Sequence, residues 1–116
     1  MFQEMMPMSQ GGGSVNPEMI YTTLTADTSF STPSGVDVKG RILIVFTWLT
    51  SSTTSSITYN AKDLINVVGG TATKLGNFAP SGTSNREGTI TRIDATSSSV
   101  SFGISSGSAY CQIVAL

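Results

Sequence analysis

The stretch GRILIVFTWLT, residues 40–50, decides the fold of this chain. Successive side chains of a β-strand point to opposite faces of a sheet, and both faces of this segment are apolar. Burial of a large apolar side chain contributes about 1.5–3 kcal/mol, so neither face is expected to stay in water. The pattern predicts a central strand that is covered on both sides, with Trp48 packed in the core rather than stacked on a ligand. One face carries Ile42, Ile44, Phe46 and Trp48, and the other carries Leu43, Val45, Thr47 and Leu49.

The last segment, AYCQIVAL at residues 109–116, has the same two-sided apolar character. We therefore expect it inside a sheet, beside residues 42–49. Residues 100–105 alternate more strictly, because Val100, Phe102 and Ile104 are separated by serine and glycine. That alternation predicts an antiparallel strand with one buried and one solvated face.

Several shorter segments also show β patterns. Residues 19–26 alternate as a half-buried first strand, and residues 57–59 begin a return strand after a hydroxyl-rich loop. Residues 71–75 form a short strand, after which Phe78 is expected to turn inward, and residues 88–95 resume an extended pattern. Clusters of glycine, proline and serine separate these segments and predict turns.

Residues 60–69, NAKDLINVVG, allow two structures. Asn60 can cap one or two helical turns. In contrast, the β-branched side chains of Ile65, Val67 and Val68 favour an extended strand. We prefer the strand and keep the short helix as the alternative.

Seven to eight short strands with turn signals about every 8–12 residues are typical of a sandwich or barrel rather than of alternating strands and helices. No amphipathic helix of useful length is apparent. The fold class that we predict is all-β: an antiparallel, jelly-roll-like β-sandwich of seven to eight strands. This domain is expected to span residues 19–116, preceded by a flexible N-terminal arm of residues 1–18.

The arm is separated from the domain by three consecutive glycines, and a glycine run has too much conformational entropy to be regular structure. Two interpretations of the arm stay open. It is either a disordered terminus or a segment that docks into a neighbouring subunit through flexible apolar side chains. The candidate docking residues are Met1, Phe2, Met5, Met6 and Met8.

Charge and hydropathy argue against several partners and locations. Only 11% of the residues are charged, roughly 30% are Ser or Thr, and the net charge is −1, so we expect no binding to nucleic acid or to an anionic membrane. The opening residues lack the Lys or Arg and the sustained apolar run of a secretory signal peptide. The longest apolar run, residues 42–46, is too short for a membrane helix of about 20 residues. We expect a soluble protein that is not exported through a signal peptide.

The sequence offers little for catalysis. Histidine, the usual general base beside a serine or cysteine nucleophile, is absent from the chain. Cys111 lies in an apolar strand and is expected to be a buried, inert thiol. The aspartates are scattered singly, without the ligand spacing of a metal site, and no glycine-rich phosphate loop occurs. We therefore predict a non-enzymatic protein with no catalytic residues, no cofactor and no bound metal.

Aromatic residues provide the only binding hypothesis from the residues themselves. Tyr21, Tyr59 and Tyr110 can offer a sugar an apolar ring with a hydrogen-bonding edge. Loops at residues 51–56 and 80–88 would supply hydroxyl and amide groups around them. These tyrosines are the candidate glycan contacts.

Two parts of the sequence resemble virion proteins. The opening MFQEMMPMSQGGG resembles the short leaders of small virion proteins in phages and prophages. The segment DATSSSVSFGISSGSAYCQIVAL, residues 94–116, is similar to the closing strands of small jelly-roll-like sandwiches at the ends of phage tail fibres and in head or tail decorations. This resemblance transfers no functional residues.

The resemblance implies a bacteriophage structural or accessory protein of the virion or its tail, made in the host cytoplasm. It also implies a symmetric homo-oligomer, with a trimer favoured, in contact with other virion proteins. The low charge, the abundant hydroxyl side chains and the lack of candidate catalytic residues fit that role. The alternative is a carbohydrate- or receptor-binding module used for host adhesion.

Overall fold

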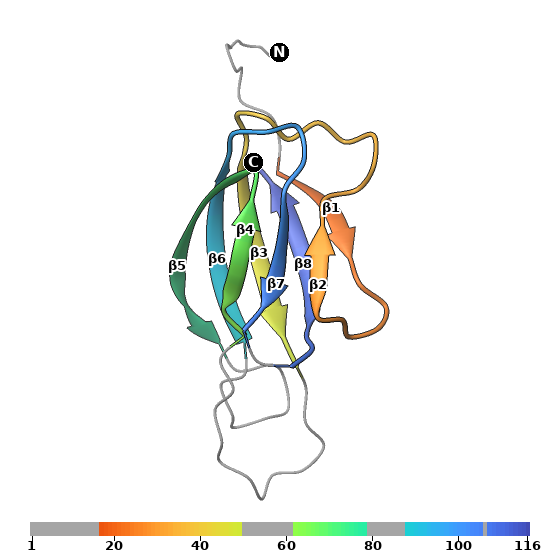
Figure 1. The fold of residues 1–116 in the computed structure, drawn as a ribbon, viewed down its shortest axis with the longest axis vertical. Coiled ribbons are helices and arrows are strands. Elements are labelled where there is room, and N and C mark those ends of the chain that lie inside the picture. Colours follow the sequence, from red (N-terminus) through yellow and green to blue (C-terminus); the bar gives the residue numbers. More distant parts are fainter. Residues whose placement is uncertain (1–16, 50–61, 79–87, 106) are drawn as a thin grey trace, which may run out of the picture.

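The computed structural model describes residues 17–49, 62–78, 88–105 and 107–116. Eight strands and no helix occur in these ranges, so the all-β prediction is confirmed (Figure 1). The strands are β1 (Glu18–Thr22), β2 (Ser29–Ser31), β3 (Ile42–Trp48), β4 (Leu64–Val68), β5 (Gly70–Phe78), β6 (Gly88–Ala95), β7 (Ser101–Ile104) and β8 (Tyr110–Ala115).

The strands form two antiparallel sheets that lie one in front of the other in Figure 1. The larger sheet has the order β1-β8-β3-β6-β5, and the smaller one has the order β2-β7-β4. β3 is therefore the central strand of the larger sheet. β8 pairs with β3, with Ile113 opposite Val45, which confirms the prediction that the last strand lies beside residues 42–49.

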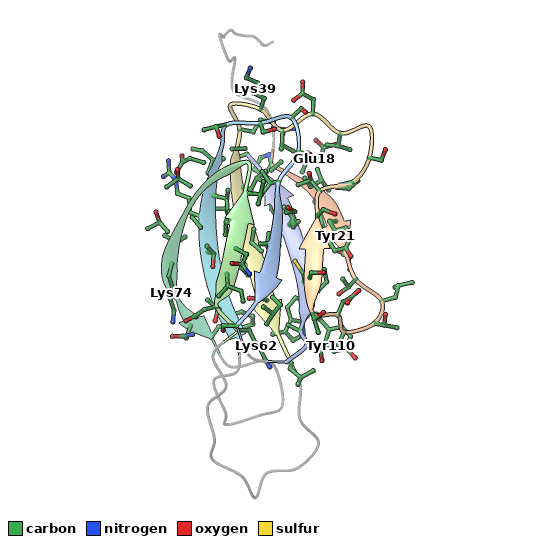
Figure 2. All side chains as sticks on the ribbon, viewed as in Figure 1. Glu18, Tyr21, Lys39, Lys62, Lys74 and Tyr110 are labelled. Atoms are coloured by element: carbon green, nitrogen blue, oxygen red, sulfur yellow. The ribbon has the colours of Figure 1, made fainter. Side chains whose placement is uncertain are left out.

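The core fills the space between the two sheets (Figure 2). From the larger sheet, Leu43, Val45 and Ile113 are fully buried, and Phe30 and Phe102 approach them from the smaller sheet. The rings of these two phenylalanines lie 5.9 Å apart. On β7 the apolar residues face the core and the serine and glycine between them face outward, as the strict alternation predicted.

The second sheet covers only one face of β3, so cover on both sides is not confirmed within the described residues of a single chain. Its outward residues, among them Ile44 and Phe46, are partly exposed, and the described residues place no further layer over them. The expectation that Trp48 packs in the core is wrong for the same reason. A two-layer fold leaves one face of each sheet outside, whatever side chains that face carries.

The second half of the chain corrects one further prediction. β5 continues through Gly76, and a bulge between Lys74 and Gly76 shifts its register against β6. Because one extra residue reverses the alternation, Phe78 lies on the outer face beside Phe46 instead of turning inward.

Two other segments differ less from expectation. β4 is a strand rather than a short helix, with Asn66 in a left-handed conformation at an irregular point of its pairing with β7. The first strand is shorter than predicted because it ends at Thr22, and Leu24 beyond it is 92% exposed. The predicted arm at residues 1–18 lies outside the described residues except for its last two, and so does the return strand predicted at residues 57–59.

Candidate interaction surfaces

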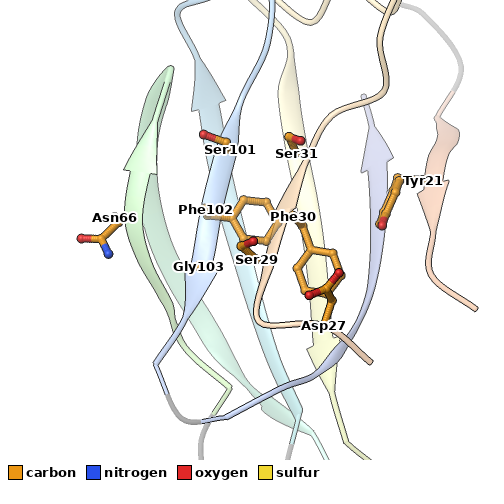
Figure 3. Close-up of a pocket in the computed structure, with 9 residues that line it drawn as sticks. All are labelled: Tyr21, Asp27, Ser29, Phe30, Ser31, Asn66, Ser101, Phe102 and Gly103. Carbon is orange, nitrogen blue, oxygen red and sulfur yellow. The ribbon is translucent and has the colours of Figure 1, made fainter. Parts of the chain in front are cut away.

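A groove of about 590 Å³ crosses the outer face of the smaller sheet (Figure 3). Ser29 and Ser31 of β2 and Ser101 of β7 line its floor, because their neighbours Phe30 and Phe102 point into the core. Tyr21 and Asp27 close one end. Asn66 lines the opposite end, with its amide directed away from the serines (Figure 3).

Tyr21 is held in this groove by an aromatic contact. Its ring meets Phe30 edge-on, with the ring centres 6.0 Å apart. Burial raises the pKa of the Tyr21 hydroxyl above its ordinary value, and the negative charges that Cys111 and Asp27 can carry act in the same direction. The hydroxyl therefore stays protonated at neutral pH and can donate a hydrogen bond.

Asp27 is fixed beside it by the backbone. Its amide and carbonyl both bond to Ala109, at 3.0 and 2.9 Å, and its carboxylate accepts a 2.8 Å hydrogen bond from the amide of Thr28. The carboxylate keeps further lone pairs for a ligand. The groove thus combines an acceptor, several hydroxyls and the rings of Tyr21, Phe30 and Phe102, a set suited to a polyhydroxylated ligand.

The second surface is the outer face of the larger sheet. At its centre Ile44 pairs with Val114 of β8 and Arg92 of β6, and Phe46 pairs with Gln112 of β8 and Ile90 of β6. Charged groups reach the middle of this face, because Arg92 lies directly beside Ile44 and forms an ion pair with Asp94 at 2.8 Å. The outer face of the smaller sheet also carries exposed apolar side chains, because Ile65 and Val68 of β4 are 42% and 65% exposed.

An aromatic cluster occupies one end of that outer face. Trp48 stacks on Tyr110 with a centroid distance of 5.9 Å, and Phe78 lies 6.5 Å from Trp48 and 6.2 Å from Phe46. Gly88 permits this arrangement, because a Cβ there would collide with the ring of Phe78. The cluster joins three strands through side chains that are far apart in the sequence.

The candidate glycan tyrosines are not brought together. Tyr21 belongs to the groove, whereas Tyr110 stacks on Trp48 on the outer face of the larger sheet (Figure 2). Tyr59 lies outside the described residues, as do the docking residues Met1, Phe2, Met5, Met6 and Met8. The sequence showed that Trp48 and Tyr110 are aromatic, but only strand pairing reveals that they are neighbours.

The described residues offer few groups for metal binding or nucleophilic chemistry. The described ranges contain no cluster of three or more potential metal ligands from His, Cys, Asp and Glu. Cys111 is fully buried, as expected, and burial raises the pKa of its thiol to about 12. No helix in the described part of the chain is long and apolar enough to cross a membrane.

Comparisons with known proteins identify no relative. No family model, no curated protein and no solved structure matches this chain. Its function is therefore inferred from the chemistry of the two surfaces.

Proposed function

We propose that this chain is a non-enzymatic structural subunit of a bacteriophage virion. In this proposal a jelly-roll-like sandwich assembles into a symmetric oligomer, and residues 1–18 attach it to other virion proteins. The observation that carries the proposal is the apolar outer face of the larger sheet, centred on Ile44 and Phe46. Large apolar side chains that are partly exposed next to one another often mark a surface that a partner covers.

The rest of the surface supports a structural role. The outer face of the smaller sheet carries serines, and charged residues make up only 11% of the chain, so long-range electrostatics would not select a partner. The sequence resemblance to virion leaders and tail-tip sandwiches supplies the biological setting. No catalytic arrangement is needed for such a role.

The state of association in solution tests the proposal. Sedimentation velocity and light scattering on the full chain should report a defined oligomer, with a trimer favoured. Far-ultraviolet circular dichroism should show that the sample is folded β-structure. A strict monomer at high micromolar concentration would overturn the proposal.

The docking role of the arm has its own test. Deletion of residues 1–13 should leave the circular dichroism spectrum and the oligomer unchanged but abolish incorporation into particles. Incorporation at the level of the full chain would remove the docking role while leaving the structural one.

Carbohydrate binding is the second candidate function, and the groove at Tyr21 favours it. A ring, a carboxylate and a row of serine hydroxyls meet there. A glycan array should then give hits that Tyr21→Ala loses. Tyr110→Ala is the matched control, because Tyr110 lies on the other face of the molecule. An array without hits, or hits that Tyr21→Ala leaves intact, would exclude this function.

A further inference from the structure

The groove on the outer face of the smaller sheet contains one charged side chain. Of the described residues that line it, Asp27 carries a carboxylate, and none is a lysine or an arginine. Elsewhere in the described ranges, three acidic side chains pair with cations: Glu18 with Arg41, Asp63 with Lys74 and Asp94 with Arg92. Asp27 forms no ion pair within those ranges, so the described lining of the groove leaves its negative charge uncompensated.

The backbone fixes the position of this carboxylate. Asp27 pairs with Ala109 in an isolated antiparallel bridge, which ties the end of the groove to the segment before β8. One carboxylate oxygen, Oδ1, accepts the amide hydrogen bond of Thr28. A carboxylate has about four acceptor positions, so Asp27 keeps acceptor capacity for a ligand. A group that is already held in place loses little conformational freedom when a ligand binds.

The neighbour of Asp27 in the groove is also suited to a cation. Tyr21 closes the same end (Figure 3), and its edge-on contact with Phe30 fixes the direction of its ring. Burial chiefly raises the pKa of the Tyr21 hydroxyl, and the charge of Asp27 also contributes, as expected of groups that lie near each other. An aromatic face attracts an ammonium group through the ring quadrupole. The carboxylate and the ring at this end therefore both favour a positively charged ligand group.

The floor of the groove offers hydroxyls around an open position. Ser31 of β2 pairs with Ser101 of β7, and Ser29 pairs with Gly103, which has no side chain. Paired residues lie about 5 Å apart, and alternate residues of one strand lie about 7 Å apart. Within the described ranges the three serine hydroxyls make no hydrogen bond to the protein. A sugar ring can rest over Gly103 with these hydroxyls at its edges.

Two other ligand classes fit this groove less well. An acidic sugar would bring a second carboxylate toward Asp27, and the described lining has no cation to offset the repulsion. A peptide that adds a strand needs a length of free backbone at a sheet edge. The edge strand beside the groove, β2, has only three residues.

We propose that the groove binds amino sugars, which are saccharides with a free, protonated amine, and that the ammonium group lies at Asp27 while the ring lies over the serine-lined floor. This inference rests on the proposed carbohydrate-binding role and adds the charge of the ligand to it. A neutral sugar would make the same contacts with the hydroxyls but would leave the carboxylate without a cation.

Two oligosaccharides that differ only at their nitrogen atoms test this preference. A glucosamine trimer carries free amines, and its N-acetylated counterpart carries neutral amides. Isothermal titration calorimetry of the full chain at about pH 6, where amines are protonated, should give the glucosamine trimer about fivefold higher affinity. A galacturonic acid trimer, which carries carboxylates, should bind more weakly than either.

A pair of matched variants tests the role of the carboxylate. Asp27→Asn removes the charge but keeps the oxygen that accepts the hydrogen bond from Thr28, so it should abolish the preference without weakening binding of the N-acetylated trimer. Asp37→Asn is the control. Asp37 is likewise exposed and accepts a 3.0 Å hydrogen bond from the amide of Lys39, but it does not line the groove. This variant should keep the preference, and circular dichroism verifies that both variants fold.

The outcomes separate the inference from the carbohydrate-binding role. If none of the three sugars binds, both fail. Equal affinities for the glucosamine trimer and its acetylated counterpart, or a preference that persists in Asp27→Asn, would overturn the inference alone. Displacement of the glucosamine trimer by an equal or lower concentration of tetralysine would also overturn it, because the groove would then select cations in general.

A salt series gives a second measurement that needs no variant. Because Asp27 is exposed, salt should screen its attraction for the amine. The preference for the glucosamine trimer should therefore fall toward equal affinities between about 0.05 M and about 1 M NaCl. A preference that does not change with salt would overturn the inference even if Asp27→Asn failed to fold.

Discussion

Gly69 joins β4 to β5 in a backbone conformation that side-chain-bearing residues rarely adopt. Its φ is 93°, and its carbonyl accepts hydrogen bonds from Thr96 and Ser97, at 2.8 and 3.1 Å. A Cβ at this position would collide with the carbonyl oxygen of Ser99. Gly35 has a similar φ of 85°, but a Cβ there would meet nothing within 4 Å. A side chain at Gly35 would therefore meet backbone strain alone, whereas a side chain at Gly69 would meet both backbone strain and a steric clash.

Gly69→Ala should therefore destabilise the protein much more than Gly35→Ala. We expect a loss of about 1 kcal/mol from strain alone at Gly35 and of at least about 3 kcal/mol at Gly69, where the loop must also move. Urea unfolding of both variants measures the difference. Equal losses of stability in the two variants would show that the backbone at Ser99 moves away from the new methyl group without an energetic cost.

Cys111 illustrates how burial acts on a single ionisable group. Its thiol is fully buried, and its pKa is raised to about 12 because the thiolate would lose its hydration. Well below the ordinary thiol pKa of about 9, the thiol is protonated in both folded and unfolded chains, so it adds no pH dependence there. At higher pH only the unfolded chain ionises, and the stability due to this group is lost as the pH rises toward 12.

From about pH 8 to about pH 10, this group should lower the free energy of unfolding by about 1 kcal/mol. Cys111→Ala is the control, because it lacks the thiol and should lose correspondingly less over the same interval. Urea unfolding at both pH values gives the comparison, since the other ionisable groups are shared. Parallel pH profiles for the two proteins would contradict the burial argument.

Among the elements, β3 and β6 are joined at one end by buried hydroxyls as well as by apolar packing. Thr47 and Thr89 face inward and are both fully buried. The hydroxyl of Thr47 donates a 2.6 Å hydrogen bond to the carbonyl of Lys62, and that of Thr89 accepts a 3.1 Å bond from the amide of Lys62. These bonds anchor the start of the β4 segment to the larger sheet. Leaving a buried carbonyl without its hydrogen-bond donor lowers the stability of the fold. The attachment of the segment before β4 therefore depends on these hydroxyls.

Thr47→Val should therefore cost about 1–3 kcal/mol although it preserves shape and β-propensity. Thr91→Val is the matched control on β6, because Thr91 is 3% exposed and its hydroxyl makes no hydrogen bond in the described part of the chain. That variant should change stability by less than about 0.5 kcal/mol. Thermal and urea unfolding measure both. A neutral Thr47→Val would mean that another donor serves Lys62.

At the level of the whole molecule, two sheets share one core and leave two outer faces. Apolar side chains of the larger sheet occupy both its inner and its outer side, and the smaller sheet carries exposed Ile65 and Val68 on β4 beside the outward serines of β2 and β7. The hydroxyl-lined groove and the outer face of the larger sheet lie on opposite sides of the molecule. Association through the outer face of the larger sheet would leave the groove accessible, so self-assembly and ligand binding are compatible.

The proposed assembly should be insensitive to salt. Apolar contact is not screened by salt, and the Arg92–Asp94 ion pair on the outer face of the larger sheet lies within each copy. Sedimentation velocity from about 0.05 M to about 1 M NaCl should give a constant mass at fixed protein concentration. Dissociation at high salt would instead indicate a contact made by charges between copies.

Hydrophobic alternation alone was enough to identify the strands that build the core. Residues 42–48, 88–95, 101–104 and 110–115 alternate or are apolar throughout, and each is a strand in the structure. The preference for a strand over a helix at residues 64–68 followed from β-branched side chains and is also confirmed. These features are local, because they depend on a side chain and its nearest neighbours in the chain.

The sequence determined that the chain folds into β-strands and which of its segments are apolar, because both properties belong to short stretches of residues. Only the tertiary structure decided which side of β3 is covered, where Phe78 points and which aromatic residues meet. Those outcomes depend on strand order, on one bulge in β5 and on the pairing of β8 with β3. Contacts of this kind join residues far apart in the chain, so no local pattern encodes them.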